Sequence, residues 1–354
     1  MGIYKLMSLI QEKAAAAIKS LPLESYTGRI IACDASMSIY QFLISTMYVR
    51  EGEGVVQELK DKEGNPTAHL IGIYYRTIQL LEHGIKPIWV FDGKPPEMKM
   101  EELSKRKDAK IKAEEQKVEA IKEGNMELAK KMAQRSVKVT PKMTEDAKKL
   151  VSLMGAPVIE APSEAEAQCA AMCKAGLVYG TASEDMDSLT FGTNILLRGF
   201  NNKKEPITQI DLSEVLKGFG MNMDEFIDLC IMCGCDYTNS VDGIGPIKAY
   251  KFMKEGKSIE KVLALLDKYN SNPAKKKKYI VPADFNYVKS REMFKNPDVT
   301  LKVEMKWNKA DSEGLHKFMV EEKNFSEARF QSGMKKITVI VLSANAFGRH
   351  SNKD

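Results

Sequence analysis

The sequence predicts an α/β fold with a mostly parallel central sheet flanked by helices. Between residues 29 and 197, short apolar runs typical of buried strands alternate with amphipathic segments of helical spacing. This alternation favours parallel strands that are joined by helical crossovers. Several apolar runs are followed by acidic residues, and open parallel sheets bind ligands at the carboxyl ends of their strands. These acids are therefore the first candidates for a functional site.

The expected strands are short runs of apolar residues bounded by acids, glycines or prolines. In chain order they are Arg29–Asp34, Lys86–Asp92, Ala156–Glu160, Val178–Ala182 and Asn194–Leu197. The first two end directly in an aspartate, and Gly93 breaks the chain after the second.

The expected helices repeat apolar residues at intervals of three and four. They are Ile3–Ile18, Ser36–Met47, Ala68–His83, Thr144–Met154, Ala165–Ala175 and Asp224–Cys233. The polar stretch Glu97–Arg135 has helical composition, a weak point at Gly124 and no strong apolar stripe, which is typical of a solvent-bridging helix held by charge pairs. Residues 51–65 are expected to form a loop. A β-like run is expected at 337–342, followed by a frayed tail.

Positive charge is concentrated in one segment. The whole chain has 53 basic and 48 acidic residues, a surplus of 5. Residues 94–149 hold 16 Lys or Arg against 11 Asp or Glu, so this segment carries an equal surplus. A local basic patch suits phosphate, although a solvated charged helix explains the composition about as well.

The cysteines and histidines give no support for a disulfide framework, a zinc site or a histidine-based catalytic site. Six cysteines without a preceding signal peptide favour a reducing compartment over a disulfide framework. Cys230 and Cys233 have metal-like spacing but lie in an apolar helical run, so they are expected to be small buried hydrophobes. The four histidines lie outside every motif, and the longest apolar runs are too short to span a membrane.

Seven acids are expected to gather near one edge of the sheet. They are Asp34, Asp92, Glu164, Glu166, Asp185, Asp187 and Asp236. Mg²⁺ prefers oxygen ligands and is usually held by a few carboxylates together with substrate phosphate. Two such ions about 4 Å apart stabilise the attacking and leaving oxygens of phosphodiester cleavage. Without a cation these acids would repel one another, so the pattern predicts a metal site.

Each acidic pair also has an ordinary structural interpretation. Ser163 and Glu166 fit a capping box, and Ser183 fits a second helix N-cap. Glu164 and Glu166 are two residues apart and point different ways on a helix, so at most one is expected to touch a metal directly. The coincidence of both pairs with three other acids favours the metal site over capping alone.

The segment Val241–Ala249 places a Gly-x-Gly turn between two expected helices. Gly243 and Gly245 would expose backbone N–H groups there, and the second helix would present its positive end. Both features suit phosphate, but an ordinary helix–turn–helix corner explains the pattern equally well.

Together these motifs resemble the structure-specific 5′-nuclease (XPG/Rad2-like) family, in particular flap endonucleases of the eukaryotic and archaeal type. The matching stretches are Met1–Ile3, Asp34–Phe42, Val90–Pro96, Ala161–Ala167, Glu184–Asp187, Asp236–Tyr237 and Gly243–Pro246. They occur in family order across residues 1–335, which is nearly the whole chain.

The resemblance implies that the seven acids bind two Mg²⁺ ions per active site, with Mn²⁺ as a substitute. It assigns residues 97–135 to a helical arch through which a 5′ flap passes. Lys99 and Arg106 would approach the scissile phosphate, where cations stabilise developing negative charge. Tyr40 would stack on the neighbouring base, and Lys110 and Glu164 would also face the substrate.

The resemblance also assigns Gly243, Gly245 and Lys248 to a helix–two-turn–helix element. In the family this element grips the backbone of the uncut strand and is associated with a bound K⁺. The first of two usual basic positions after Gly-Pro holds Ile247 here, which leaves Lys248. Substrate choice would rest on DNA shape, because phosphate contacts carry no sequence information.

The implied partner is branched DNA with 5′ flaps, bound by a monomer in the nucleus and not at a membrane. A sliding clamp is a further partner of the family, but its usual C-terminal motif is not recognisable here. Gln331 matches the first position of this motif, but Ile337 and Thr338 occupy the positions where aromatic residues are usual. The basic tail that usually directs nuclear import is also missing from this sequence.

We therefore expect a Mg²⁺-dependent 5′ flap endonuclease with 5′–3′ exonuclease activity, acting in Okazaki fragment maturation and long-patch base-excision repair. One nuclease core is expected over residues 1–335, followed by a tail at 336–354. Within the core, the N-terminal nuclease region spans 1–110 and the internal region 144–260, with the helix–two-turn–helix element near 234–256. The alternatives are a 5′ exonuclease or junction resolvase of the same superfamily, and a catalytically silent DNA-junction binder.

Overall fold

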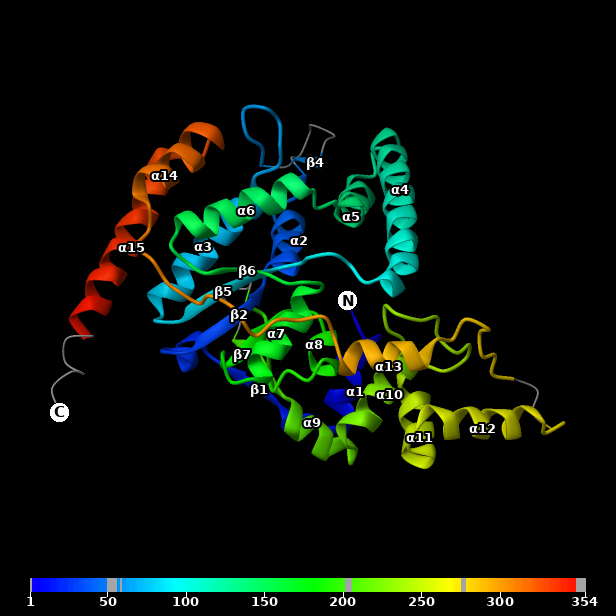
Figure 1. Cartoon of the computed structure of the whole chain (residues 1–354). Coiled ribbons are helices and arrows are strands. Elements are labelled where there is room, and N and C mark those ends of the chain that lie inside the picture. The colour runs from blue at the N-terminus through cyan, green and yellow to red at the C-terminus, as the bar shows by residue number, and fades with distance from the viewer. Residues whose placement is uncertain (1, 50–55, 58, 201–205, 275–277, 348–354) are drawn as a thin grey trace, which may run out of the picture. The chain divides into compact units, whose positions relative to one another are not determined.

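The computed structural model describes residues 2–49, 56–57, 59–200, 206–274 and 278–347 (Figure 1). The chain divides into two compact units, each assembled from segments that are distant in sequence. Unit 1 comprises Met1–Pro22, Asp92–Glu102 and Ala161–Leu301, and unit 2 comprises Leu23–Phe91, Leu103–Glu160 and Lys302–Asp354.

Unit 2 is built on three parallel strands, β2 (Ile30–Asp34), β5 (Lys86–Phe91) and β6 (Val158–Glu160). β5 lies between the other two and pairs in parallel with both. Every side chain of β5 after Lys86 is buried, which explains its uninterrupted apolar run. The indole N–H of Trp89 donates to Thr77 at 3.1 Å, which connects β5 to the helix α3 (Ala68–Glu82).

Three longer helices pack around these strands. They are α2 (Ala35–Ser45), α3 (Ala68–Glu82) and α6 (Pro141–Leu153). α3 packs against α2, α6 and the C-terminal helix. The smaller elements of unit 2 are η2 (Leu23–Tyr26), β3 (Tyr48–Val49), β4 (Val56–Gln57), α14 (Ser312–His316), the π-helical turn η4 (Lys317–Glu322) and α15 (Glu327–Phe347).

The polar stretch folds as a helical pair that Figure 1 shows side by side. A 3₁₀ turn, η3 (Glu97–Lys99), leads into α4 (Met100–Lys122), and α5 (Met126–Ser136) follows. The expected break is confirmed: Gly124 has φ 73°, and Asn125 caps α5 by accepting from the N–H of Leu128 at 3.1 Å. Only two alanines of α4 are buried, so its stability depends on charge pairs more than on a hydrophobic face.

Unit 1 contains a four-stranded mixed arrangement in the order β1 (Ile18–Leu21), β9 (Ile207–Asp211), β8 (Ile195–Arg198) and β7 (Gly180–Ala182). β7 and β8 are parallel, whereas β9 is antiparallel to both β8 and β1. The loop after β7 therefore leaves the sheet at the carboxyl end of a parallel strand, where Asp185 and Asp187 follow.

The helices of unit 1 surround one hydrophobic core. They are α1 (Leu6–Lys13), the 3₁₀ turn η1 (Ala15–Ala17), α7 (Ala165–Lys174), α8 (Asp187–Thr190), α9 (Leu212–Phe219), α10 (Met223–Cys233), α11 (Pro246–Gly256), α12 (Ile259–Asn270) and α13 (Tyr287–Lys295). α10 is buried from Phe226 to Cys233, and a capping box of Asn222 and Glu225 fixes its start.

The α/β class and the five predicted strands are confirmed, with ends that differ by one or two residues. The helix expected over Ile3–Ile18 is wrong at its end, because Ile18 begins β1 and pairs with β9. The β-like run at Ile337–Leu342 is also wrong, since it lies within α15. In both cases tertiary context overrides local propensity. Residues 336–347 of the expected tail are part of α15, and residues 348–354 lie outside the described residues. The loop expected over 51–65 contains the short strand β4.

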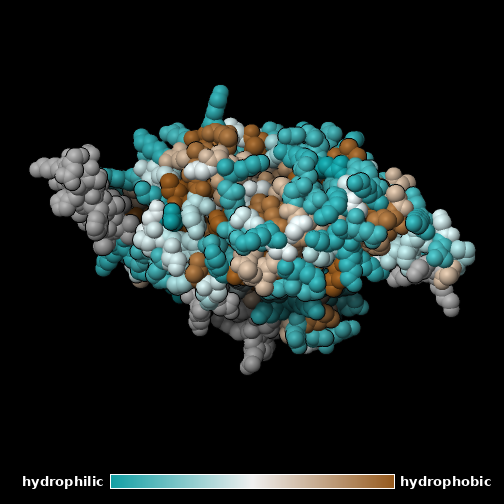
Figure 2. Space-filling model, turned by 90° about the horizontal axis from the view of Figure 1, so that it is seen from below, coloured by the Kyte–Doolittle hydropathy of each residue, from teal (hydrophilic) through white to brown (hydrophobic). Residues whose placement is uncertain are grey.

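The face in Figure 2 is mostly hydrophilic, and its hydrophobic residues form small separate groups. Among the described residues, no helix is both long enough and apolar enough to span a bilayer.

Candidate metal centre and DNA-contacting residues

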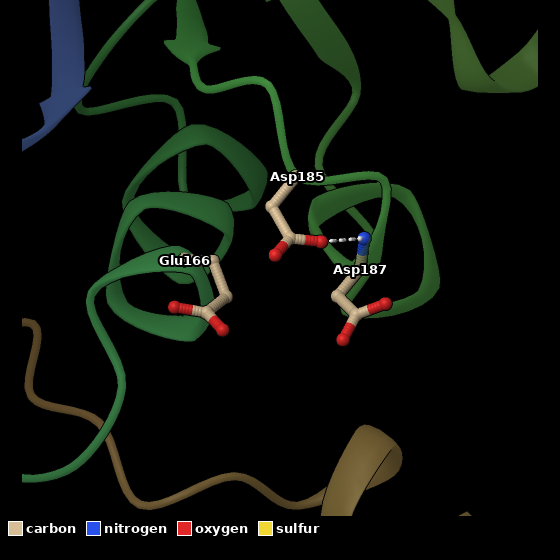
Figure 3. Close-up of side chains that lie close together, drawn as sticks. All are labelled: Glu166, Asp185 and Asp187. Carbon is tan, nitrogen blue, oxygen red and sulfur yellow. Dashed lines mark hydrogen bonds between the residues drawn. The ribbon is translucent and has the colours of Figure 1, made fainter. Parts of the chain in front are cut away.

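Glu166, Asp185 and Asp187 form a compact carboxylate cluster in unit 1. One oxygen from each lies within 4.8 Å of the others, and all three residues are buried. Figure 3 shows the three side chains directed toward the same space. Glu166 lies in the first turn of α7, Asp185 in the loop after β7, and Asp187 at the start of α8. Residues about twenty positions apart in sequence thus meet in one site.

The loop after β7 is held in place by its own side chains. The hydroxyl of Ser183 accepts from the N–H of Asp185 at 3.0 Å, and Asp185 Oδ1 accepts from the N–H of Asp187 at 3.0 Å (Figure 3). Glu184 points elsewhere: its carboxylate accepts from the N–H of Gly199 at 2.7 Å and pairs with Arg198 at 3.1 Å. The first acid of the run therefore anchors the loop to the end of β8, and the two aspartates that follow it face the cluster.

The electrostatics of the cluster favour binding of a cation. Burial raises the pKa of Glu166 well above its usual range, Lys99 opposes this shift, and neighbouring carboxylates add to it. Burial and nearby acids likewise raise the pKa of Asp187 well above its usual value, and burial raises that of Asp185. A bound cation would relieve this repulsion and the cost of buried charge.

The donor set fits a hard divalent cation. The Oδ1 atom of Asp187 is buried and has no hydrogen-bond partner among the described residues. Buried carboxylate oxygens are normally satisfied by hydrogen bonds or metals. All three donors are oxygens, which suits Mg²⁺ or Mn²⁺ better than a thiolate-binding metal. The residues present therefore fit the metal expected from the sequence.

Glu164 lies beside the cluster and is held from two sides. The ammonium of Lys99 ion-pairs with its Oε1, and the hydroxyl of Tyr237 donates to its Oε2. Lys99 also lies 3.4 Å from Glu166 Oε1 and 3.6 Å from Asp236 Oδ2. Burial alone would lower the pKa of Lys99, but Glu166, Glu164 and Asp236 outweigh this effect and raise it. Lys99 is therefore a permanent cation among these acids.

Asp92 supports the helix that carries Glu166. Its Oδ1 accepts from the N–H of Ala165, the first residue of α7, at 2.8 Å. Gly93 approaches the backbone so closely that an added Cβ would lie 2.0 Å from the carbonyl oxygen of Ala161. The break after β5 therefore positions Asp92 at the start of α7.

Two capping interpretations are wrong. The N-cap of α7 is Glu164 rather than Ser163, which places Glu166 at the second helical position and rules out the capping box. The N-cap of α8 is Met186, so Ser183 does not cap a helix and instead fixes the N–H of Asp185. Glu164 and Glu166 both approach the ammonium of Lys99, although only Glu166 joins the three-carboxylate cluster. That at most one of the two touches a metal directly stays a prediction.

The remaining predicted site residues of the catalytic region belong to unit 2. Asp34 ends β2 and caps α2 by accepting from the N–H of Met37 at 3.0 Å. Tyr40 lies on α2, and the ammonium of Lys110 on α4 sits 5.6 Å from its ring centroid. Burial lowers the pKa of Lys110, and the like charges of Arg106 and Lys138 lower it further. These three cations thus form a positive patch.

The Gly-x-Gly turn joins α10 to α11 as expected. Gly243 has φ 82°, a conformation that favours glycine, whereas Gly245 has an ordinary extended backbone and serves as N-cap of α11. A Cβ at Gly245 would meet nothing within 4 Å, so the surface there is open to an approaching ligand. The ammonium of Lys248 donates to the carbonyl of Gly243 at 2.8 Å, and Ile247 is exposed.

The sequence reasoning missed three residues with direct roles in this geometry. Gly2 has φ 74°, and an added Cβ would lie 1.9 Å from Asp185 Oδ1 and 2.5 Å from Asp187 Oδ1. Tyr237 adjoins a predicted ligand but had no assigned role, and Lys138 lies outside the arch range. Gly2 and Tyr237 lie in stretches that carry the family resemblance, and that signal could have identified them, whereas no motif of the sequence singles out Lys138.

Comparison with known proteins gives two matching domain profiles. Residues 1–113 match the XPG N-terminal domain, and residues 155–236 match the XPG I-region. Flap endonuclease 1 of Tetrahymena thermophila is 50% identical over 339 residues, which cover 95% of this chain and 88% of that protein. Flap endonuclease 1 of Danio rerio is 48% identical over 343 residues, with 96% and 87% covered.

Solved structures show the same similarity. The flap endonuclease-1 from Methanococcus jannaschii has a TM-score of 0.71 and 35% identity, with 92% of this chain and 97% of that chain covered. The catalytic core of Rad2 in complex with DNA substrate has a TM-score of 0.72 and 25% identity, with 95% and 100% covered.

Proposed function

The chain belongs to the flap endonuclease branch of the XPG/Rad2-like nuclease family, and on this basis we propose the role of each site residue in DNA cleavage. The protein is a structure-specific 5′ flap endonuclease, a phosphodiester hydrolase. We place its action at the junction of single strand and duplex, with 5′–3′ exonuclease activity, in Okazaki fragment maturation and long-patch base-excision repair.

The observation that carries the proposed mechanism is the buried cluster of Glu166, Asp185 and Asp187. Three carboxylate oxygens within 4.8 Å, together with a buried Asp187 oxygen that has no partner among the described residues, form a ready set of ligands for Mg²⁺. Asp92, Glu164 and Asp236 belong to the same unit and are proposed as further direct or water-mediated ligands. Asp34 remains a predicted seventh ligand on the strength of the family resemblance.

Two bound Mg²⁺ ions would supply Lewis-acid stabilisation of the attacking and leaving oxygens of the scissile phosphate. Asp185 and Asp187 would hold their oxygens in position through the hydrogen bond from the Asp187 N–H. Asp92 would orient α7, and with it Glu166, through the N–H of Ala165. The three carboxylates of the cluster are buried, so competing water is excluded and their electrostatic effect is strengthened.

The basic residues are proposed to act on the phosphates. Lys99 and Arg106 would stabilise the charge that develops at the scissile phosphate. The patch of Arg106, Lys110 and Lys138 would attract the phosphates that flank the scissile one, because three cationic side chains lie close together there. Tyr40 would stack on the adjacent base, as aromatic residues do with single-stranded nucleic acid.

The helix–two-turn–helix element is proposed to bind the backbone of the uncut strand. Gly243 supplies the left-handed turn, and the open surface at Gly245 lets a phosphate approach the N-terminus of α11. Lys248 would secure the turn through the carbonyl of Gly243 as well as face the DNA. A K⁺ ion bound to carbonyls of this turn is proposed from the family resemblance.

The proposed partner is branched DNA with a 5′ flap, and the proposed state is a nuclear monomer. Sliding-clamp binding is kept as a separate proposal, because Ile337 and Thr338 do not supply the usual aromatic anchors. A pull-down with a sliding clamp that compares the full chain with a chain ending before Gln331 tests this proposal. Equal capture of both chains would show that the segment from Gln331 onward is not the clamp-binding site.

The central test is cleavage of a labelled double-flap DNA with Mg²⁺ by the wild type and by Asp187→Ala. The wild type should cut at the junction, and the variant should lose at least about a hundredfold in rate while still binding the flap. Full cleavage by a folded Asp187→Ala would overturn the assignment. Faster cutting of nicked or four-way-junction DNA would indicate an exonuclease or resolvase, and flap binding without any cutting would indicate a silent binder.

A further inference from the structure

Lys99 is in contact with the same carboxylates that are proposed to bind metal. Its ammonium pairs with Glu164 and lies 3.4 Å from Glu166 and 3.6 Å from Asp236, while only 14% of the side chain is exposed. Glu166 is also one of the three acids that converge in Figure 3. Lys99 and a bound divalent cation would therefore both interact with the carboxylate of Glu166.

We propose that Lys99 and the metal compete for these carboxylates, so that metal loading releases Lys99 and makes it available to the scissile phosphate. This inference rests on the proposed function and adds an order of events to it. An ammonium held a few ångströms from a divalent cation in a buried site is strongly repelled, since like charges interact strongly at low dielectric. A cation bound by Glu166 would lie within a few ångströms of this ammonium and would weaken its hold on the acids.

The backbone of Lys99 is fixed, so the proposed release requires only a movement of its side chain. Lys99 is the last residue of η3, and α4 starts at the next residue. Its N–H donates to the carbonyl of Pro96 at 3.0 Å, so the backbone is fixed on one side while the long side chain retains its rotamers. A released ammonium can therefore swing away from the acids without refolding of the chain.

Tyr237 keeps Glu164 oriented after such a release. Its hydroxyl donates to the oxygen of Glu164 that Lys99 does not hold, and its ring packs edge-on against Phe294 at 5.0 Å. Glu164 thus has one fixed donor and one exchangeable donor. Because Tyr237 stays bound, Glu164 would keep its orientation when Lys99 leaves it.

By linkage, removing Lys99 should tighten metal binding in the absence of DNA. The probe is Mg²⁺ alone, added to the DNA-free full-length protein at about pH 8.5, where proton competition for the carboxylates is reduced. The readout is the rise in melting temperature with Mg²⁺ concentration, because a ligand that binds the folded state stabilises it. Lys99→Met should reach a given rise in melting temperature at about tenfold lower Mg²⁺ than the wild type, equivalent to about 1.4 kcal/mol, and should also lose cleavage.

Lys148→Met is the matched control, since Lys148 is partly buried and pairs with Glu145 and Glu160, which are not proposed ligands. It should leave the Mg²⁺ response unchanged. An unchanged or weaker Mg²⁺ response of a folded Lys99→Met would overturn the exchange. If neither the wild type nor Lys99→Met responds to Mg²⁺ at all, the proposed metal site fails instead.

A direct measurement of release avoids reliance on the variant. Acetylation of lysines by acetic anhydride in the wild-type protein, read by mass spectrometry, reports how accessible each ammonium is. Labelling of Lys99 should increase severalfold on addition of Mg²⁺, whereas that of Lys148 should not change. Labelling of Lys99 that is insensitive to Mg²⁺, in a protein that Mg²⁺ stabilises, would contradict the exchange.

Discussion

Replacing Tyr237 by phenylalanine tests whether Glu164 must be held in place for catalysis. The hydroxyl is buried and donates to Glu164 Oε2, while the ring packs against Phe294 and would be unaffected. Burial and the neighbouring acids raise the pKa of the Tyr237 phenol, so it remains a donor at neutral pH. The substitution therefore removes one hydrogen bond and little else.

The expected size of the effect follows from the kind of bond removed. A hydrogen bond to a charged group contributes about 1.5–3 kcal/mol, and losing it leaves a buried oxygen without its donor. Because each 1.4 kcal/mol is a factor of ten, a loss of this size corresponds to a roughly tenfold to hundredfold effect. We expect Tyr237→Phe to need about tenfold more Mg²⁺ for half-maximal cleavage, in line with the usual effect of groups that orient metal ligands.

The assay is cleavage of a labelled double-flap DNA over a Mg²⁺ titration, with the melting temperature measured in parallel. Tyr74→Phe is the control, because that tyrosine is also buried but its hydroxyl donates to the carbonyl of Phe330 at 3.2 Å. Both variants remove one buried hydrogen bond, but only Tyr237→Phe should shift the Mg²⁺ requirement. If the two variants show the same Mg²⁺ dependence, the hydrogen bond to Glu164 serves the fold and not the reaction.

Three other predictions follow from the structure. Gly2→Ala should slow cleavage about a hundredfold, because its Cβ would lie 1.9 Å from an oxygen of Asp185 and displace it; wild-type rates on flap DNA would refute this. Burial raises the pKa of Asp187 above its unfolded value, so without metal its contribution to stability improves as pH falls through that pKa. Asp187→Asn should then raise the melting temperature in EDTA at about pH 8, by about 2–4 °C per kcal/mol recovered. It should also flatten the fall of the melting temperature with pH above the ordinary pKa of an aspartate; a lower melting temperature would refute the repulsion. Arg291→Met should cost about 3–5 kcal/mol in urea unfolding, because it strips the buried Asp228 of contacts at 2.7 and 2.9 Å; a loss below about 1 kcal/mol would contradict that estimate.

The sequence by itself determined the α/β class, because apolar runs and helical periodicity are local signals that survive in the fold. It also determined the chemical nature of the site. Asp185 and Asp187 follow a strand so closely that the end of β7 must carry them, and a set of oxygen donors specifies a hard cation whatever the detailed geometry. The break in the polar helical stretch at Gly124 was likewise fixed locally, by a residue that tolerates φ 73°.

Tertiary structure alone decided which groups meet. Ile18–Leu21 is a strand because β9 lies beside it, although Ile18 ends the helical pattern of the preceding residues. Lys99 and Tyr237 reach Glu164 across separations of 65 and 73 residues, and no spacing rule links positions that far apart. The helix start at Ala165 makes Glu164 the N-cap, where Lys99 and Tyr237 hold it. It places Glu166 in the first turn, where it joins the aspartates and still lies 3.4 Å from Lys99. Local periodicity shows which side chains face inward, but long-range packing determines which of them share the same buried space.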